Sequence, residues 1–269
     1  MSVQPGTRAL TLIVLAFACA SCAPRSPADS ATGSPGGTTR AGRLIFDGSL
    51  RSSWALEQSA SSSRVASVPD PTGTSAPTLQ FTTYNSDVAP LTPTANPRAQ
   101  LLTPAVIKKG QTLWESFEVY VPSSFPSIQP GEGWISLETA VYGAPFAGSP
   151  AAEIGIDGGD FRFQRDVYAP TPYSIAWSSP LVKDRWVRFT WHFLVARNGW
   201  VELYVDGTQV LLNNGSTRVR RLHMPLIDPT DATGPWFSDL QLYYMHNEFP
   251  SLTVLFKGFR IATTRSLAG

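Results

Sequence analysis

The stretch RWVRFTWHFLVARNGWVELYVDG, residues 185–207, decides the fold, because its side chains alternate with a period of two. One face of this stretch carries only large apolar side chains, which are Val187, Phe189, Trp191, Phe193 and Val195. Arg188 and His192 fall on the opposite face, as in a strand that buries one face in a core. Asn198-Gly199 tolerates the positive φ of a tight turn, so we predict a hairpin that returns through residues 200–206.

Short runs of the same alternating kind recur along the chain, separated by Pro, Gly, Asn and Asp. We predict strands at 43–47, 77–83, 98–102, 113–121, 134–142, 152–157, 160–165, 186–195, 200–206, 208–212, 239–246 and 252–261. No stretch has a helical period for more than about two turns. This pattern favours an all-β jelly-roll β-sandwich of two antiparallel sheets. An immunoglobulin sandwich needs only about 100 residues, and the predicted strands extend over more than twice that length. We expect one such domain at 43–269.

The N-terminal residues predict export. Arg8 precedes an apolar run, residues 9–20, that is too short to span a bilayer, so residues 1–22 fit a signal peptide. Ala20-Ser21-Cys22 resembles a bacterial lipobox, which implies a lipid on Cys22 and a place on the outer face of the bacterial cell membrane. Ordinary secretion is the alternative. Residues 23–42 are rich in Pro, Ser, Gly and Thr, which predicts a flexible tether.

Composition excludes several classes of function. Charged residues make up 15% of the chain and the net charge is +1, so nothing favours binding to nucleic acid. Cys19 would leave with the signal peptide and Cys22 would carry lipid, so the domain depends on its core rather than on a disulfide. We expect a monomer that contacts the membrane only through the lipid.

Metal ligands are sparse in the sequence. His223 and His246 have no Cys, Asp or Glu at ligand spacing, which argues against a transition-metal site. Asp228 and Asp231 lie in one turn and suggest calcium only weakly. We therefore expect no cofactor, with calcium as the minor alternative.

The open face of one jelly-roll sheet commonly forms a ligand groove, so polar and aromatic side chains opposite an apolar strand face define the candidate site. We predict these outward side chains to be Arg98 and Gln100; Trp134, Ser136, Glu138, Ala140 and Tyr142; Arg162 and Gln164; and Asp239, Gln241 and Tyr243. The inward side chains of the second of these strands are predicted to be Ile135, Leu137, Thr139 and Val141. The competing interpretation gives the outward side chains ordinary surface roles, such as ion pairing for Arg98 and solvation for Glu138.

Six segments, taken together, resemble the sequence of a known family. They are NPRAQL (96–101), WESFEVYVP (114–122), WISLE (134–138), YGAPFAGSP (142–150), the hairpin at 185–207 and LTVLFKGFRIATT (252–264). Together they resemble the heparin lyase I and glucuronan lyase type of polysaccharide lyase, within the concanavalin A-like jelly rolls. The resemblance covers nearly everything from residue 43 onward and is strongest in framework segments, which speak for fold more than for activity.

The resemblance implies β-elimination at a uronate sugar. This reaction needs a group that neutralises the carboxylate, a base for the α proton and an acid for the leaving oxygen. The family pattern has an Arg-x-Glu strand, a Gln-x-His strand and a Tyr near the end of a Lys-containing strand. Arg98 matches the Arg, Gln100 replaces the Glu, Tyr142 replaces the His, and Tyr243 keeps the Tyr although the Lys is lost.

By this resemblance the implied catalytic residues are Arg98, Gln100, Tyr142 and Tyr243. The implied substrate-binding residues are Trp134, Glu138, Arg162, Gln164 and Gln241. Three functions follow. The first is a glycan-binding, lyase-like domain tethered to the envelope, and the second is an active lyase. The third is an adhesion or envelope-structure domain without a working groove. Because an ordinary tyrosine titrates near pH 10, we expect any elimination to rise toward alkaline pH.

Overall fold

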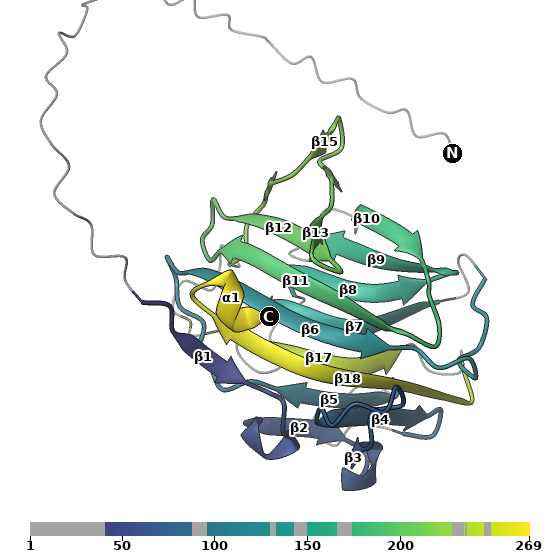
Figure 1. Ribbon diagram of the computed structural model, residues 1–269. Helices are drawn as coiled ribbons and strands as arrows, with labels where there is room; N and C mark the ends of the chain where they lie inside the picture. Colours follow the sequence, from purple (N-terminus) through teal and green to yellow (C-terminus); the bar gives the residue numbers. More distant parts are fainter. Residues whose placement is uncertain are drawn as a thin grey trace, which may run out of the picture. The chain divides into compact units, whose positions relative to one another are not determined.

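The computed structural model describes residues 41–87, 96–129, 133–142, 150–165, 174–227, 234, 236–244 and 249–269. Residues Ala41–Gly269 form one compact unit. Within the described residues this unit is almost entirely β-structure in two stacked sheets (Figure 1). The all-β jelly-roll sandwich expected from the sequence is therefore confirmed.

The larger sheet has nine strands within the described residues. They are β1 (Leu44–Asp47), β3 (Val65–Val68), β4 (Thr78–Tyr84), β6 (Thr112–Tyr120), β11 (Trp186–Leu194), β12 (Trp200–Val205), β13 (Thr208–Gln209), β16 (Leu222–His223) and β18 (Ser251–Ala262). The main path runs β13-β12-β11-β6-β18-β4-β3, with β1 on β18 and β16 on β12. We call it the nine-stranded sheet.

The second sheet has seven strands in the order β10-β9-β8-β7-β17-β5-β2. They are β2 (Leu56–Ser59), β5 (Arg98–Leu102), β7 (Trp134–Tyr142), β8 (Ala152–Asp157), β9 (Asp160–Arg165), β10 (Ser174–Pro180) and β17 (Phe237–Tyr244). Outside both sheets are the hairpin of β14 (Leu212–Asn213) and β15 (Arg218–Val219), the 3-10 turns η1 (Arg51–Ser53) and η2 (Ser62–Arg64), and α1 (Arg265–Ala268). No helix in the described part of the chain is long and apolar enough to cross a membrane.

The hairpin predicted at residues 185–207 forms as expected. β11 pairs antiparallel with β12, with Leu194 opposite Trp200. The side chains of Val187, Phe189, Trp191, Phe193 and Val195 are buried. Arg188 is exposed and His192 half-buried on the other face of the strand. Trp191 meets Phe163 of the opposite sheet edge-to-face, with ring centroids 4.9 Å apart, so these rings join the two sheets.

Most of the predicted strand boundaries lie within two residues of the observed ones. The predicted strand at 208–212 is wrong, because β13 ends at Gln209 and a separate hairpin begins at Leu212. The sequence interpretation missed β2, β3, β10, β15 and β16. Each of these lies at or next to an edge of its sheet, where a regular apolar alternation is not required.

The predicted facing of β7 is wrong at Glu138, Thr139 and Ala140, whereas Val141 lies in the core as predicted. Ser136 pairs with Gly155 and Glu138 with Ile154, so a β-bulge adds one residue to β7 and reverses the alternation. Glu138 is fully buried between the sheets, where its Oε2 accepts a 2.9 Å hydrogen bond from Trp191 Nε1. Ala140 also joins the core, whereas Thr139 lies opposite Glu153 on the outer side. Glu138 therefore does not face the groove.

Candidate functional site

One row of side chains crosses the outer face of the seven-stranded sheet in strict register. Arg98 of β5 lies opposite Tyr243 of β17, and Tyr243 lies opposite Ser136 of β7. Ser136 lies opposite Gly155 of β8, which lies opposite Arg162 of β9. We call these five residues the polar row. Inward neighbours such as Leu101, Leu242 and Phe163 are in the core, which fixes the direction of the row to the outside.

Arg98 is the half-buried cation at one end of the polar row. Its Nη1 donates hydrogen bonds to the side-chain oxygens of Gln58, at 3.1 Å, and of Gln100, at 3.2 Å. Its guanidinium carbon lies 4.2 Å from the centre of the Tyr243 ring. Among the described residues no carboxylate forms an ion pair with Arg98, and its buried Nε has no hydrogen-bond partner. Two amides and a ring orient this charge, and no carboxylate of the described residues pairs with it directly.

Tyr243 and Trp134 form the aromatic part of the site. Their ring centroids are 5.0 Å apart in an edge-to-face arrangement, and both side chains are partly exposed. Asn96 Nδ2 donates a 2.9 Å hydrogen bond to the Tyr243 hydroxyl. Partly exposed rings beside a cation are suited to contact the C–H faces of a sugar while a charge is held next to them.

Gln100 connects Arg98 to a buried acid, Asp239, through its side-chain amide. Gln100 Nε2 donates a 2.6 Å hydrogen bond to Asp239 Oδ2. Burial raises the pKa of Asp239 to about 6, although hydrogen bonds from Thr139 and Gln100 and the positive charge of Arg98 oppose this shift. Asp239 is completely buried, so it supports Gln100 from below rather than meeting a ligand.

The other end of the row carries a second chain of polar contacts. Gln241 Nε2 donates a 2.6 Å hydrogen bond to Ser136 Oγ. Ser136 also lowers the pKa of Glu153 and so opposes part of the shift that burial causes. Arg162 Nη1 donates to Asp157 Oδ2 at 2.9 Å, and its Nη2 lies 3.7 Å from Glu153 Oε1. Burial raises the pKa of Glu153 to about 7, although the charge of Arg162 opposes this. Arg162 thus has two acidic partners within ion-pair distance, whereas Arg98 has none among the described residues.

The structure brings together most of the residues singled out from the sequence. Arg98, Gln100, Gln241, Tyr243, Trp134, Arg162 and Gln164 belong to neighbouring strands on the outer face of the seven-stranded sheet. The backbone of Tyr142 pairs with Phe237, but its side chain lies outside the described residues. Cys22, Asp228, Asp231 and His246 also lie outside them. Within the described residues no group of three or more potential ligands could hold a metal ion.

Sequence reasoning missed four residues of this site: Gln58, Asn96, Glu153 and Asp157. Gln58 lies in an unpredicted edge strand, and Asn96 precedes β5. Glu153 and Asp157 did lie in a predicted strand, where Ile154 and Ile156 mark the inward face. The alternation in this strand was therefore a usable signal for two outward acids.

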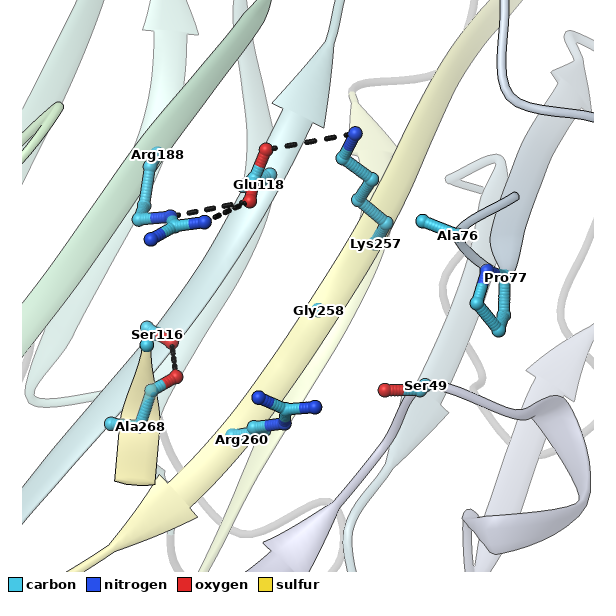
Figure 2. A pocket seen from close by; sticks show the side chains of 11 residues that line it. Ser49, Ala76, Pro77, Ser116, Glu118, Arg188, Lys257, Gly258, Arg260 and Ala268 are labelled. Carbon is cyan, nitrogen blue, oxygen red and sulfur yellow. Dashed lines mark hydrogen bonds and ion pairs between the residues drawn. The ribbon is translucent and has the colours of Figure 1, made fainter. Parts of the chain in front are cut away.

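A pocket of about 270 Å³ lies elsewhere, on the outer face of the nine-stranded sheet (Figure 2). Its cations are paired. Arg188 Nη2 lies 2.5 Å from Glu118 Oε1, and Arg260 Nε lies 3.3 Å from Asp47 Oδ2. Lys257 Nζ lies 2.9 Å from Asp70 Oδ2. We call this surface the ion-pair pocket, and it shares no residue with the polar row.

Three of the solved structures that the chain resembles are a polysaccharide lyase and two glycoside hydrolase family 131 catalytic domains. The endo-β-1,4-glucuronan lyase of the fungus Trichoderma reesei is 14% identical with a TM-score of 0.59, covering 81% of this chain and 94% of its own. A glycoside hydrolase family 131 catalytic domain from Coprinopsis cinerea is 15% identical with a TM-score of 0.53, covering 81% and 94%. A GH131 β-glucanase domain from Podospora anserina is 16% identical with a TM-score of 0.52, covering 84% and 100%. At these identities the likeness establishes the fold.

The class is thus a jelly-roll sandwich of the polysaccharide lyase-like kind. The family model for polysaccharide lyases matches residues 47–223, and the chain belongs to this family. The resemblance seen in the sequence is thereby confirmed. No curated protein sequence matches the chain.

Proposed function

We propose that the protein binds a uronate-containing polysaccharide across the polar row, with Arg98 holding one sugar carboxylate. The observation that carries this proposal is the half-buried guanidinium of Arg98, which has amide and ring partners but no carboxylate among the described residues. Removing a charge from water is costly unless an opposite charge meets it. An arginine whose donors are free on one side binds carboxylates with a strong, directional hydrogen-bond pair.

The surroundings of Arg98 support a sugar as the carrier of that carboxylate. Trp134 and Tyr243 offer partly exposed rings at the same end of the row. Membership of the polysaccharide lyase family supports a polysaccharide, and the Trichoderma reesei structure is that of a glucuronan lyase, which supports a uronate. The related GH131 hydrolases caution against inferring the reaction from the fold alone.

β-Elimination is the second candidate function, and Tyr243 favours it. Its hydroxyl group stands beside the proposed carboxylate position and accepts a hydrogen bond from Asn96, so a proton could leave or reach the sugar at this atom. Against it, Gln100 and Tyr142 occupy the positions where the family pattern has Glu and His. Binding without cleavage is therefore the first proposal.

Two assays on the purified domain separate these functions. Calorimetric titration with glucuronan, alginate and a neutral β-glucan tests binding, and we expect heat only with the polyuronates. Absorbance of the unsaturated uronate product, followed from pH 6 to 10, tests elimination. Binding without product supports a binding domain, and product that rises with pH and vanishes in Tyr243→Phe supports a lyase. Absence of binding to every polyuronate rejects both.

We also propose that the domain is exported and held at the outer face of the bacterial membrane by a lipid on Cys22. The support is the signal-like run at residues 9–20 followed by Ala20-Ser21-Cys22. Mass spectrometry of the mature protein should find Cys22 as a lipid-modified N-terminus, whereas an unmodified terminus at another residue would reject the anchor.

A further inference from the structure

Asp239 is a buried carboxyl group that one amide joins to Arg98. Gln100 Nε2 donates a 2.6 Å hydrogen bond to Asp239 Oδ2, and Gln100 Oε1 accepts a 3.2 Å hydrogen bond from Arg98 Nη1. Asp239 Oδ1 is buried as well and has no hydrogen-bond partner in the described part of the structure. No cation of the described residues forms an ion pair with Asp239. A buried carboxylate without an ion-pair partner is unfavourable, so the site favours the protonated acid.

The charged groups around Asp239 come from four strands. Arg98 of β5 is a cation that favours ionisation of Asp239. Glu115 of β6, Glu138 of β7 and Glu153 of β8 are buried acids that interact electrostatically with Asp239 and oppose its ionisation when they are charged. Burial outweighs the effect of Arg98 and raises the pKa of Asp239 to about 6. The group therefore changes its charge in mildly acidic solution.

The geometry of Asp239 provides a place for the proton. Oδ2 accepts the hydrogen bond from Gln100, whereas Oδ1 has no partner and can carry the proton. A protonated carboxyl group still accepts hydrogen bonds, so the contact with Gln100 is kept. Protonation thus changes the charge near Arg98 without turning the Gln100 amide away from it.

We propose that Asp239 is a positioning residue of the carboxylate site, which takes up a proton when a sugar carboxylate binds to Arg98. This inference rests on the proposed function. An ionised Asp239 repels the incoming carboxylate and attracts the same guanidinium, whereas a protonated Asp239 leaves the guanidinium charge to the ligand. Binding of the ligand and binding of the proton therefore favour each other, and this coupling is reciprocal.

The coupling fixes the direction of the pH dependence. A sugar carboxylate with an ordinary pKa of about 4 or below stays charged between pH 5 and pH 8. Asp239 is mostly protonated at pH 5 and ionised at pH 8. Polyuronate binding should therefore strengthen as the pH falls from 8 to 5.

The test is calorimetric titration with a β-1,4-linked glucuronic acid oligomer, from pH 5 to pH 8, in buffers with different heats of ionisation. The difference in heat between buffers gives the number of protons that the protein takes up on binding. For the native protein we expect about threefold tighter binding at pH 5 than at pH 8, which corresponds to half a pKa unit. Uptake of a fraction of a proton should be greatest near pH 6.

Two variants assign the proton to Asp239. Asp239→Asn keeps an oxygen that accepts the hydrogen bond from Gln100 and has the charge of the protonated acid. It should bind at pH 8 about as tightly as the native protein binds at pH 5, without proton uptake. Glu115→Gln is the matched control, because Glu115 is a buried acid that accepts a hydrogen bond from Ser238 rather than from Gln100. This control should keep the pH dependence and the uptake.

The outcomes separate this inference from the proposed function. Proton uptake by the native protein and by Glu115→Gln, but not by Asp239→Asn, supports it. Native binding that does not strengthen toward pH 5, uptake that persists in Asp239→Asn, or an equal loss of affinity at every pH in this variant overturns it, while Arg98-dependent binding still stands. Absence of any binding by the native protein overturns both.

A second measurement needs no variant and applies if Asp239→Asn fails to fold. Carbon-13 NMR follows the carboxyl carbon of Asp239 through a pH titration of the native protein, with and without the oligomer. The pKa of Asp239 should rise by about half a unit when the oligomer is bound. An unchanged or lowered pKa in the complex overturns the coupling.

Discussion

The outer face of each sheet carries a cation stacked on an aromatic ring, but the two cations differ in whether a carboxylate forms an ion pair with them. Lys257 Nζ lies 4.2 Å from the centre of the Trp186 ring, and Arg98 lies 4.2 Å from that of Tyr243. Lys257 also lies 2.9 Å from Asp70, whereas the hydrogen bonds of Arg98 go to two amide oxygens and its nearest carboxyl group, that of Asp239, forms no ion pair with it. Equal ring contacts therefore accompany a cation in a direct ion pair on one sheet and a cation without one, among the described residues, on the other. This difference indicates that the ion-pair partner of Arg98 is supplied by a ligand.

Asp70, which follows β3, is a carboxylate whose charge is fully met by groups of the protein. Desolvation by burial would raise the pKa of Asp70, but hydrogen bonds from Thr74, Lys257, Thr72 and Trp186 outweigh it and hold the pKa well below its usual range. With every donor and acceptor engaged inside the protein, the Asp70–Lys257 pair has a structural role.

The largest expected effect comes from breaking that pair. Lys257→Met removes the partner of a buried carboxylate, so the free energy of unfolding should fall by about 3–5 kcal/mol. Polyuronate binding by the folded variant should not change. Chemical denaturation and calorimetric titration measure the two quantities. A loss below about 1 kcal/mol would mean that Asp70 is satisfied without Lys257.

Arg98→Met is the matched variant on the other sheet, and we expect a smaller loss of stability together with a loss of affinity. Stability should fall by about 1.5–3 kcal/mol, less than in Lys257→Met, because the guanidinium hydrogen bonds to two amides are lost but no buried carboxylate loses an ion-pair partner. Affinity for a polyuronate should fall about 10- to 100-fold, since a charge-assisted bond is lost. The same two measurements check this. If Arg98→Met lost several kcal/mol of stability but bound the polyuronate normally, Arg98 would have a structural role and not a binding role.

The acids of the two regions predict a stability profile that depends on pH. Burial raises the pKa of Glu153 and of Glu115 to about 7 and that of Asp239 to about 6, so these groups bind protons more tightly in the folded state. Their contribution is complete below the usual carboxyl pKa and is lost as the pH rises through 6 to 7. Asp70 acts in the opposite sense, because its stabilisation is lost when the pH falls below its usual pKa.

Stability should therefore be greatest near pH 4 to 5 and decline by about 1.4 kcal/mol or more toward pH 8. Chemical denaturation at closely spaced pH values checks this profile. Glu153→Gln removes one of the titrating groups, so its decline between pH 5 and 8 should be shallower than that of the native protein. An equal or steeper decline would show that Glu153 does not titrate in this range.

The smallest expected effect belongs to Tyr243→Phe. The ring under Arg98 and beside Trp134 is kept, so affinity for a polyuronate should change by less than about threefold. Only the hydrogen bond from Asn96 is lost. A much larger loss in titration would place the Tyr243 hydroxyl in direct contact with the bound sugar rather than beside it.

The sequence was informative wherever a simple alternation held. Val187 to Val195 set the inward face of β11, and the same rule placed Arg98, Gln241 and Tyr243 on one side of their sheet. It failed at Glu138, because a one-residue bulge after Ser136 cannot be read from side-chain types. That failure moved an expected groove residue into the core.

Long-range partners were beyond any local pattern. Asp70 and Lys257 are 187 residues apart, and no sequence signal links them. The contrast between a cation with a carboxylate and one without therefore emerges only from the structure. Gln58, which orients Arg98, was missed because β2 is a four-residue edge strand without apolar alternation.

The most direct test of the central claim is a double comparison of ligand and protein. Affinities of the native protein and of Arg98→Met are measured for glucuronan and for the same polymer with its carboxylates reduced to alcohols. If Arg98 holds a uronate carboxylate, the native protein should prefer glucuronan by about tenfold or more and Arg98→Met should show no preference. An equal preference in the two proteins would contradict the assignment of Arg98.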